Sequence, residues 1–473
     1  MIAAQSGPST ASLLCKRRTH GNRSDWERHN PMLRRLTRAC VRYAERYIPD
    51  PYLYALLLTF ITVAAALIWT NAAPAQIVTA WYDGVWAILA FAMQMALILS
   101  TGVALAAAPP VKKLLHGLAS IPTRQAGAAV TVFLAGAFAS WLNWGFGLVA
   151  GALVAREVAK RIRDVDFGLI VAAAYMGNMV WASGLSSSIA LASATPGSAL
   201  NLIEKVTGRV SGLSETIFTP YNLVPTVLIF CLIPLMLVAI APPESEMKRA
   251  DPARLAANEE AATIAEPQEK TFATRLENAW IITLLLVAMG LVYEWNVVTT
   301  RGFSLDINGM IFIALMLGLI FHWRPIRYVR AFNAAARTVG PILLQFPLYG
   351  GIMGMMTGTG LAAVIAQAFV AFSTHDTLPF WTFVSSNIIS LFVPSGGGHW
   401  AVQGPFMVPA AVNLKVDPAL TAMGEQTANM IQPFWALPIL AIAGLGIKDI
   451  MGYCVMALFV GLIVYGGAML IFA

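Results

Sequence analysis

The segment Pro394-Ser-Gly-Gly-Gly-His-Trp400 interrupts a long apolar stretch, residues 377–414, that contains no Asp, Glu, Lys or Arg. A proline followed by three consecutive glycines does not continue a helix. The uncharged stretch is also too short for two full membrane spans, which need about 40 residues plus a turn. It is therefore predicted to turn back on itself inside the membrane as a hairpin that opens outward, with its tip at 395–398.

A second hairpin is predicted for the uncharged residues 125–155. Basic residues flank this stretch on both sides, and basic residues in short loops are retained on the cytoplasmic face. The chain must then enter and leave the membrane on the same side, although 31 residues cannot form two spans of about 20 residues each. Two half-length helices satisfy both constraints, with a tip at 140–147 near mid-membrane. The flanking basic residues are Lys112, Lys113 and Arg124 before the stretch and Arg156, Lys160, Arg161 and Arg163 after it.

The composition of the whole chain is that of a polytopic membrane protein. Its 473 residues are 58% hydrophobic and 12% charged, and the mean hydropathy is +0.68. This leaves room for about ten to twelve crossings. A soluble enzyme, a nucleic-acid binder and a secreted disulfide scaffold are excluded. The cysteines show no CxxC or metal-ligand spacing, so no metal site is predicted; they are Cys15, Cys40, Cys231 and Cys454.

The net charge of +7 resides entirely in residues 1–46, which hold ten Lys or Arg and three acidic residues, whereas the rest of the chain is neutral. This segment is too long and too polar for a signal peptide. It is predicted to be a basic cytoplasmic tail, partly disordered, whose Arg-rich end can lie on the inner membrane face.

The same order of elements occurs twice: two spans, a hairpin, a broken span and a final span. The first copy starts inside and the second outside, which makes the fold class an all-α polytopic membrane protein of two inverted repeats, each with a re-entrant hairpin and a broken helix. Trp144 and Trp400 match at an offset of 256 residues. The predicted units are the tail 1–46, the first repeat 47–241, a cytoplasmic linker 242–277, a connecting helix and outer loop 278–306, and the second repeat 307–473. The predicted spans of the first repeat are 53–69, 85–107, a span from Phe167 that is broken at 184–188, and 221–241, with an outer loop at 70–84 between the first two. The connecting helix is predicted at 279–295. The predicted spans of the second repeat are 307–323, 339–356, 419–445, which is broken at 429–433, and 451–472.

Inverted repeats with interrupted helices are typical of secondary transporters, whose helix ends face the substrate and the coupling ion at mid-membrane. All the polar groups at the four breaks are neutral apart from His399, and no arginine lies at that depth. This favours a small anion whose charge is balanced by a co-transported cation. The predicted substrate-binding residues are Ser140, Asn143, Trp144, Gly145, Ser186, Ser187, Ser188, Ser395, Gly396, Gly397, Gly398, His399, Gln403, Asn429 and Gln432. Five tryptophans could wall a compact apolar pocket suited to short alkyl carboxylates: Trp141, Trp144, Trp181, Trp400 and Trp435.

Three runs resemble the bacterial short-chain fatty acid transporter family, within the ion transporter superfamily: NWGFGLVAGALVAREVAKR (143–161), PSGGGHWAVQGPFMVPAAV (394–412) and NMIQPFWALPILAIAGLGIKDIMGYCV (429–455). The resemblance extends from Met32 to the C-terminus. It implies a carrier for small monocarboxylates such as butyrate or acetoacetate in the bacterial inner membrane, with the N-terminus in the cytoplasm. It also implies substrate contacts at the hairpin tips 140–145 and 395–398 and at the broken segments 186–188 and 429–432.

Coupling to Na⁺ or H⁺ is expected without any other cofactor, and the coupling residues predicted are Asn143, Ser187, Ser395, Glu425 and Asn429. The expected partners are a small carboxylate and the lipid bilayer, with no nucleic acid; a homodimer is left open. Two alternatives stand beside the carrier: an intramembrane acyl-transfer enzyme with His399 as base, and a passive small-anion channel. No residue spacing supplies an acid or an activated nucleophile beside His399, and a pore would carry a ring of basic side chains.

Overall fold

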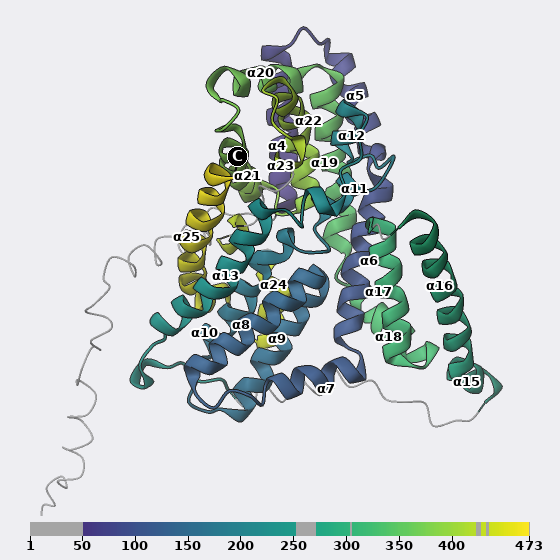
Figure 1. The fold of residues 1–473 in the computed structure, drawn as a ribbon, viewed down its shortest axis with the longest axis vertical. Helices are drawn as coiled ribbons and strands as arrows, with labels where there is room; N and C mark the ends of the chain where they lie inside the picture. Colours follow the sequence, from purple (N-terminus) through teal and green to yellow (C-terminus); the bar gives the residue numbers. More distant parts are fainter. Residues whose placement is uncertain (1–50, 252–270, 303–304, 422–426, 432–434, 473) are drawn as a thin grey trace, which may run out of the picture.

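The computed structural model describes residues 51–251, 271–302, 305–421, 427–431 and 435–472, and every regular element in these ranges is helical (Figure 1). Seven helical segments there are long and apolar enough to cross a membrane, or eight if one bent pair is counted as a span. The remaining apolar residues form shorter or interrupted helices, which accounts for the larger number of crossings estimated from composition.

The first helices lie in the upper half of Figure 1 and descend along its middle. Helix α4 (Pro51–Trp69) is long and apolar enough to cross the membrane, as predicted. The outer loop expected at 70–84 is wrong, because α5 (Pro74–Ala87) begins after only four residues, with Pro74 in its first turn. A proline fits that position because the first N–H groups of a helix have no intrahelical partner. Helix α5 then continues into α6 (Leu89–Ala106) through the single non-helical residue Ile88.

Close packing of glycines explains why residues 74–84 are helical rather than a loop. A Cβ on Gly84 of α5 would lie 2.3 Å from the carbonyl oxygen of Gly350 and 2.8 Å from Cα of Gly354, both on α19 (Gly340–Gly358). Small residues let membrane helices approach backbone to backbone. Two helices that are more than 250 residues apart in the sequence are thereby held together. Helix α19 is also bent by 55° from the preceding α18 (Pro325–Ala336).

The first predicted hairpin is present, but its arms are longer than half a span. Helices α8 (Gln125–Leu142) and α9 (Trp144–Arg161) have 18 residues each, about 27 Å at 1.5 Å per residue. The half-length expectation was wrong because α8 alone takes 18 of the 31 uncharged residues, and α9 continues beyond them through its charged end, where Lys and Arg are good helix formers. The amphipathic α7 (Pro109–Leu118) runs along the base of this hairpin, at the bottom of Figure 1.

The broken span after the first hairpin is also present. Helix α10 (Phe167–Met176) tightens into the 3₁₀ helix η1 (Gly177–Ser183), and α11 (Ser188–Ala194) begins after the break predicted at 184–188. A 3₁₀ stretch of seven residues is unusual, since such runs rarely exceed about four. The chain returns through three further elements, α12 (Leu202–Thr207), η2 (Leu213–Glu215) and α13 (Pro220–Ala239).

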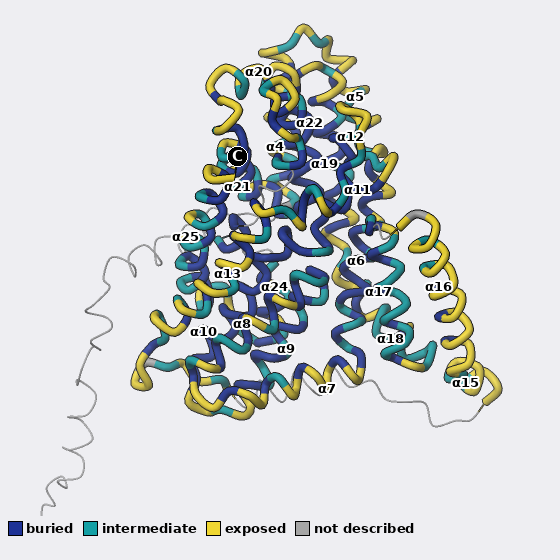
Figure 2. The backbone as a smooth tube through the Cα atoms, viewed as in Figure 1, coloured by how far each residue is buried: buried dark blue, intermediate teal, exposed yellow. Residues whose placement is uncertain are grey.

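Helix α16 (Trp280–Arg301) stands at the right edge of the molecule, where most of its surface is exposed (Figure 2). Its exposed side chains are largely apolar, which is suited to contact with lipid. It follows η3 (Glu244–Glu246) and α15 (Phe272–Glu277) and precedes α17 (Ile307–His322).

The second hairpin consists of α21 (Leu378–Phe392) and α22 (Gly396–Asn413), in the upper half of Figure 1. Its tip residue Ser395 has φ −153° and ψ 123°, nearly the same as φ −153° and ψ 119° at Asn143 in the first tip. The inverted relation of the two whole halves remains a prediction. The other elements of this half are α20 (Leu361–Phe372), α23 (Pro418–Thr421), η4 (Ala428–Met430), α24 (Ala436–Ala443) and α25 (Ile447–Ile471).

Candidate functional site

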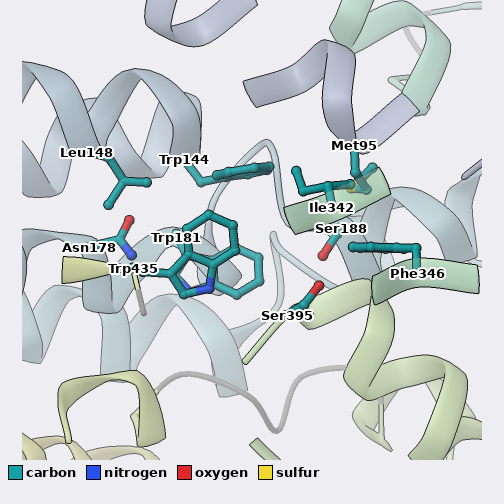
Figure 3. A pocket seen from close by; sticks show the side chains of 11 residues that line it. Met95, Trp144, Leu148, Asn178, Trp181, Ser188, Ile342, Phe346, Ser395 and Trp435 are labelled. Carbon is teal, nitrogen blue, oxygen red and sulfur yellow. The ribbon is translucent and has the colours of Figure 1, made fainter. Parts of the chain in front are cut away.

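The two hairpin tips meet at a cavity with an empty volume of about 400 Å³ (Figure 3). Trp144 of the first tip and Ser395 and Gly396 of the second lie on its wall. The break in the first half adds three residues, and the long helices α6 and α19 close the remaining side. The other lining residues are Met95, Leu148, Asn178, Trp181, Ser188, Ile342, Phe346 and Trp435.

The first tip reverses through the single extended residue Asn143. Its side-chain Oδ1 accepts a hydrogen bond from the Phe146 N–H at 2.9 Å and so caps α9. The adjacent Gly145 packs directly on α6, where an added Cβ would lie 2.9 Å from Cα of Leu99. Gly102 of α6 leaves equally little space, since its Cβ would lie 2.3 Å from Asn143 Oδ1. The glycines therefore allow the tip to sit against α6.

Serines of the broken span hold the first tip in place. The Trp144 N–H donates to Ser186 Oγ at 2.8 Å, and both residues are buried. Ser187 caps α11 by accepting from the Ala190 N–H at 3.4 Å. Ser188 lies on the cavity wall. The three serines thus have three different positions: one binds the tip, one starts a helix, and one faces the cavity.

The second tip is built on the same local principle. Ser395 caps α22 by accepting from the Gly398 N–H at 3.4 Å. Gly397 and Gly398 pack on aromatic rings, because added Cβ atoms would lie 2.2 Å from Phe91 Cε1 and 2.4 Å from Tyr349 Cδ2. The three predicted glycines therefore have separate roles: Gly396 faces the cavity, and the other two permit close packing against α6 and α19.

Aromatic side chains form much of the cavity wall. Trp144 and Trp435 pack edge to face with ring centroids 5.4 Å apart, a favourable arrangement for aromatic pairs. Trp181 lies beside them (Figure 3). Trp400 does not reach the cavity: it is fully buried elsewhere, and its Nε1 donates to the Leu200 carbonyl at 3.0 Å. Trp141 is not on the wall either; its carbonyl accepts from the Leu185 N–H at 2.7 Å.

Several predicted site residues lie away from the cavity wall. His399 Nε2 is 3.0 Å from Ser386 Oγ, and Gln403 donates to the Thr382 carbonyl at 2.9 Å, so both tie α22 to α21. The Asn429 carbonyl accepts from the Tyr175 hydroxyl at 2.6 Å, and its buried Oδ1 has no hydrogen-bonding partner among the described residues. Glu425 and Gln432 lie outside the described residues.

Asn178 is a polar lining residue that was not among the predicted site residues. Its Oδ1 accepts from Ser140 Oγ at 3.4 Å, which connects η1 to the end of α8. Ser140 itself is fully buried behind the wall. An asparagine within an otherwise apolar span, six residues before the predicted break, was the signal available. The apolar lining residues Met95, Leu148, Ile342 and Phe346 carried no such signal, because nothing distinguishes them in sequence from other core positions.

The cavity has no charged lining residue, yet its electrostatics favour an anion. The 18-residue helices α9 and α22 begin at it from opposite sides (Figure 1), and the N-terminus of a helix carries a partial positive charge. Serine hydroxyls and the Asn178 amide add neutral hydrogen-bonding groups. In the described ranges, no group of three or more His, Cys, Asp or Glu side chains is placed to hold a metal ion.

Two hairpin tips and a broken helix around a small uncharged cavity define a membrane transporter. Residues 32–471 match the family model described as "Short chain fatty acid transporter", and the chain belongs to this family. It is 42% identical over 431 residues to a protein of Escherichia coli (strain K12), covering 90% of this chain and 97% of the relative. It is 40% identical over 434 residues to a protein of Haemophilus influenzae, again covering 90% and 97%. Both relatives bear the name "Putative short-chain fatty acid transporter".

The fold also resembles that of a solved transporter. The crystal structure of the Alcanivorax borkumensis YdaH transporter, described as having an unusual topology, superposes with a TM-score of 0.58 at 16% identity. It covers 90% of this chain and 98% of that chain. At this identity the likeness concerns the fold alone. The family and its relatives are named as transporters, in agreement with the expectation that this protein is not an enzyme.

Proposed function

We propose that this protein is a secondary active transporter that carries short-chain fatty acids, such as butyrate or acetoacetate, across the inner membrane together with Na⁺ or H⁺. The observation that supports the proposal most directly is the cavity at the meeting point of the hairpin tips. Its wall combines serine hydroxyl groups with tryptophan rings and carries no charged side chain, the mixture of apolar surface and a few polar groups that is typical of small-molecule sites.

Recognition of a short carboxylate follows from the wall of this cavity. The carboxylate binds near Ser395 and Ser188, whose hydroxyl groups lie on one part of the wall (Figure 3), beside the first turn of α22. The alkyl tail packs on the rings of Trp144, Trp181 and Trp435. Burial of a short apolar tail contributes about 0.8 kcal/mol per methylene. Short-chain monocarboxylates satisfy both requirements.

A co-transported cation balances the substrate charge, because no Lys or Arg lines the cavity. The candidate coupling residues remain Asn143, Ser187, Ser395, Glu425 and Asn429. Among those described, the buried Asn429 Oδ1 has no hydrogen-bonding partner in the described ranges and is therefore the side-chain oxygen most available to a cation.

The basic side of the molecule defines the proposed orientation. Lys112 and Lys113 of α7 and the basic last turn of α9, with Lys160 and Arg161, lie on the face at the bottom of Figure 1. Basic residues in short loops mark the cytoplasmic side. We therefore place this face, and the basic N-terminal tail, in the cytoplasm.

Uptake by purified protein in liposomes tests the proposal. Saturable butyrate uptake with counterflow is expected, whereas product formation without flux would identify an acyl-transfer enzyme and end the carrier interpretation. Uptake measured without Na⁺, and then with the proton gradient collapsed, assigns the coupling ion. A double variant, Ser395→Ala with Asn429→Ala, is expected to abolish uptake while remaining in the membrane at wild-type amounts. Wild-type uptake by this variant would contradict the assigned site.

A further inference from the structure

A wide groove opens at the base of the first hairpin, away from the central cavity. Its walls come from the α7–α8 loop, the end of α9 and the segment after α13. Three arginines line it: Arg124 before α8, Arg161 at the end of α9, and Arg163 just beyond. Two acidic residues, Asp164 and Glu244, also line it.

The three arginines have no counterions among the described residues. The two acidic residues of the groove are engaged elsewhere: Asp164 accepts from Arg249 at 2.8 Å, and Glu244 lies 3.8 Å from the same guanidinium. Arg249 does not line the groove. Three unpaired guanidinium groups around one hollow form a site for a multiply hydrogen-bonding anion, and phosphate oxygens match the planar arginine donors.

A lipid-facing apolar surface starts at the same place. Leu134 and Phe138 of α8 are exposed, with 39% and 59% of their surface accessible, and Gly127 is exposed one turn after Arg124. Positions 124, 127, 131, 134 and 138 follow one face of a helix, at alternating spacings of three and four residues. The exposed Ile121 of the α7–α8 loop, 65% accessible, lies next to the groove residues Ser120 and Pro122. This face of α8 therefore leads from the arginines into the hydrocarbon.

We propose that the groove binds the phosphate of an anionic phospholipid, with an acyl chain lying along Leu134 and Phe138 of α8. Basic pockets at the cytoplasmic ends of membrane helices are suited to such headgroups. A soluble phosphate would fill the arginine site but leave the apolar face unused, so the continuity of the two surfaces favours the lipid. The bound lipid would brace the base of the hairpin whose other end carries Trp144.

Native mass spectrometry of the delipidated full-length protein in detergent tests this proposal, with phosphatidylglycerol added at increasing concentration. The triple variant Arg124→Gln, Arg161→Gln, Arg163→Gln is expected to bind it about a hundredfold more weakly, at about fivefold per arginine. The matched control removes three charges outside the groove: Lys112→Gln, Lys113→Gln, Arg337→Gln. Its affinity is expected to stay near that of the wild type. Should the triple variant fail to fold, Arg163→Gln alone, in a loop, is expected to lose about fivefold.

Two further measurements separate a lipid from a soluble anion. The pair Leu134→Ala and Phe138→Ala is expected to weaken phosphatidylglycerol binding, and inorganic phosphate is expected to displace the lipid only at far higher concentration. Undiminished lipid binding by the triple variant, or an equal loss in the control, would overturn the site. Displacement by inorganic phosphate at concentrations comparable to the lipid would overturn the lipid assignment.

Discussion

The hydrogen bond between Ser186 and the first hairpin tip is the contact whose loss should affect substrate binding most directly. Ser186 is fully buried, and its Oγ accepts the Trp144 N–H at 2.8 Å. Replacement by alanine leaves a buried backbone N–H without a partner, at a cost of about 1–3 kcal/mol. The tip can give the Trp144 N–H a new partner only by moving. Because Trp144 lies on the cavity wall, this movement displaces part of the proposed binding site.

The expected effect is an increase in KM for butyrate. If the whole cost falls on the substrate-binding conformation, Ser186→Ala raises KM by about five- to 150-fold, since 1.4 kcal/mol corresponds to a factor of ten. The maximal rate per transporter should change much less. The assay is the initial rate of butyrate uptake into liposomes, over a range of butyrate concentrations, with the reconstituted protein quantified.

Ser193→Ala is the matched control. Ser193 is also fully buried, but its Oγ donates only to the Ile189 carbonyl of its own helix, at 3.0 Å. Its replacement removes a hydroxyl of equal burial without freeing a tip N–H, so KM should stay close to that of the wild type. An unchanged KM in Ser186→Ala, or an equal rise in both variants, would refute the reasoning that the hydroxyl positions Trp144.

Three other substitutions test the site and its packing. Gly398→Ala places a Cβ 2.4 Å from the Tyr349 ring, so the Tm of this variant in detergent should fall by an amount equivalent to about 1–3 kcal/mol of stability. Gly467→Ala is the control, because no neighbouring atom lies within 4 Å of the added Cβ, and this variant should melt like the wild type. Trp144→Leu enlarges the cavity and leaves room for a longer alkyl tail. The ratio of kcat/KM for hexanoate to kcat/KM for butyrate, measured by competition uptake, should therefore rise roughly fourfold per added methylene. An unchanged ratio would show that Trp144 does not contact the alkyl tail. His399→Gln should retain most butyrate uptake, because His399 lies off the cavity wall, and a complete loss of proton-driven uptake would show otherwise.

The sequence was sufficient to locate the breaks, because they depend on local chemistry. At the second tip the helix stops at Phe392 and restarts at Gly396, because Pro394 disfavours helical continuation; the three glycines, expected to be part of the break, instead form the first turn of α22. After Gly184, Ser187 starts a new helix by capping it. The loop charges required a hairpin at 125–155, and the structure contains one. The length of its arms was misjudged because the estimate counted uncharged residues, whereas α9 extends through Lys160 and Arg161.

The direction of each side chain could not be predicted from the sequence, and this direction decides which candidate residues line the cavity. Ser188, Ser395 and Gly396 line the cavity, while His399 lies one turn beyond the tip and contacts Ser386. The direction of each side chain depends on the rotation of its helix, which is set by contacts with distant segments such as α19. For the same reason, Ile342 and Phe346 entered the wall without any signal in their own sequence.

Trp435 connects the two hairpin tips. Its Nε1 donates to the carbonyl of Pro394 in the second tip, and its ring packs edge to face on Trp144 in the first. The first tip has a single non-helical residue, Asn143, between α8 and α9. One connecting residue cannot absorb a displacement of the hairpin, so Trp144 moves whenever this hairpin moves. Any motion that separates the tips and opens the cavity is therefore expected to break either the hydrogen bond of Trp435 to Pro394 or its ring contact with Trp144.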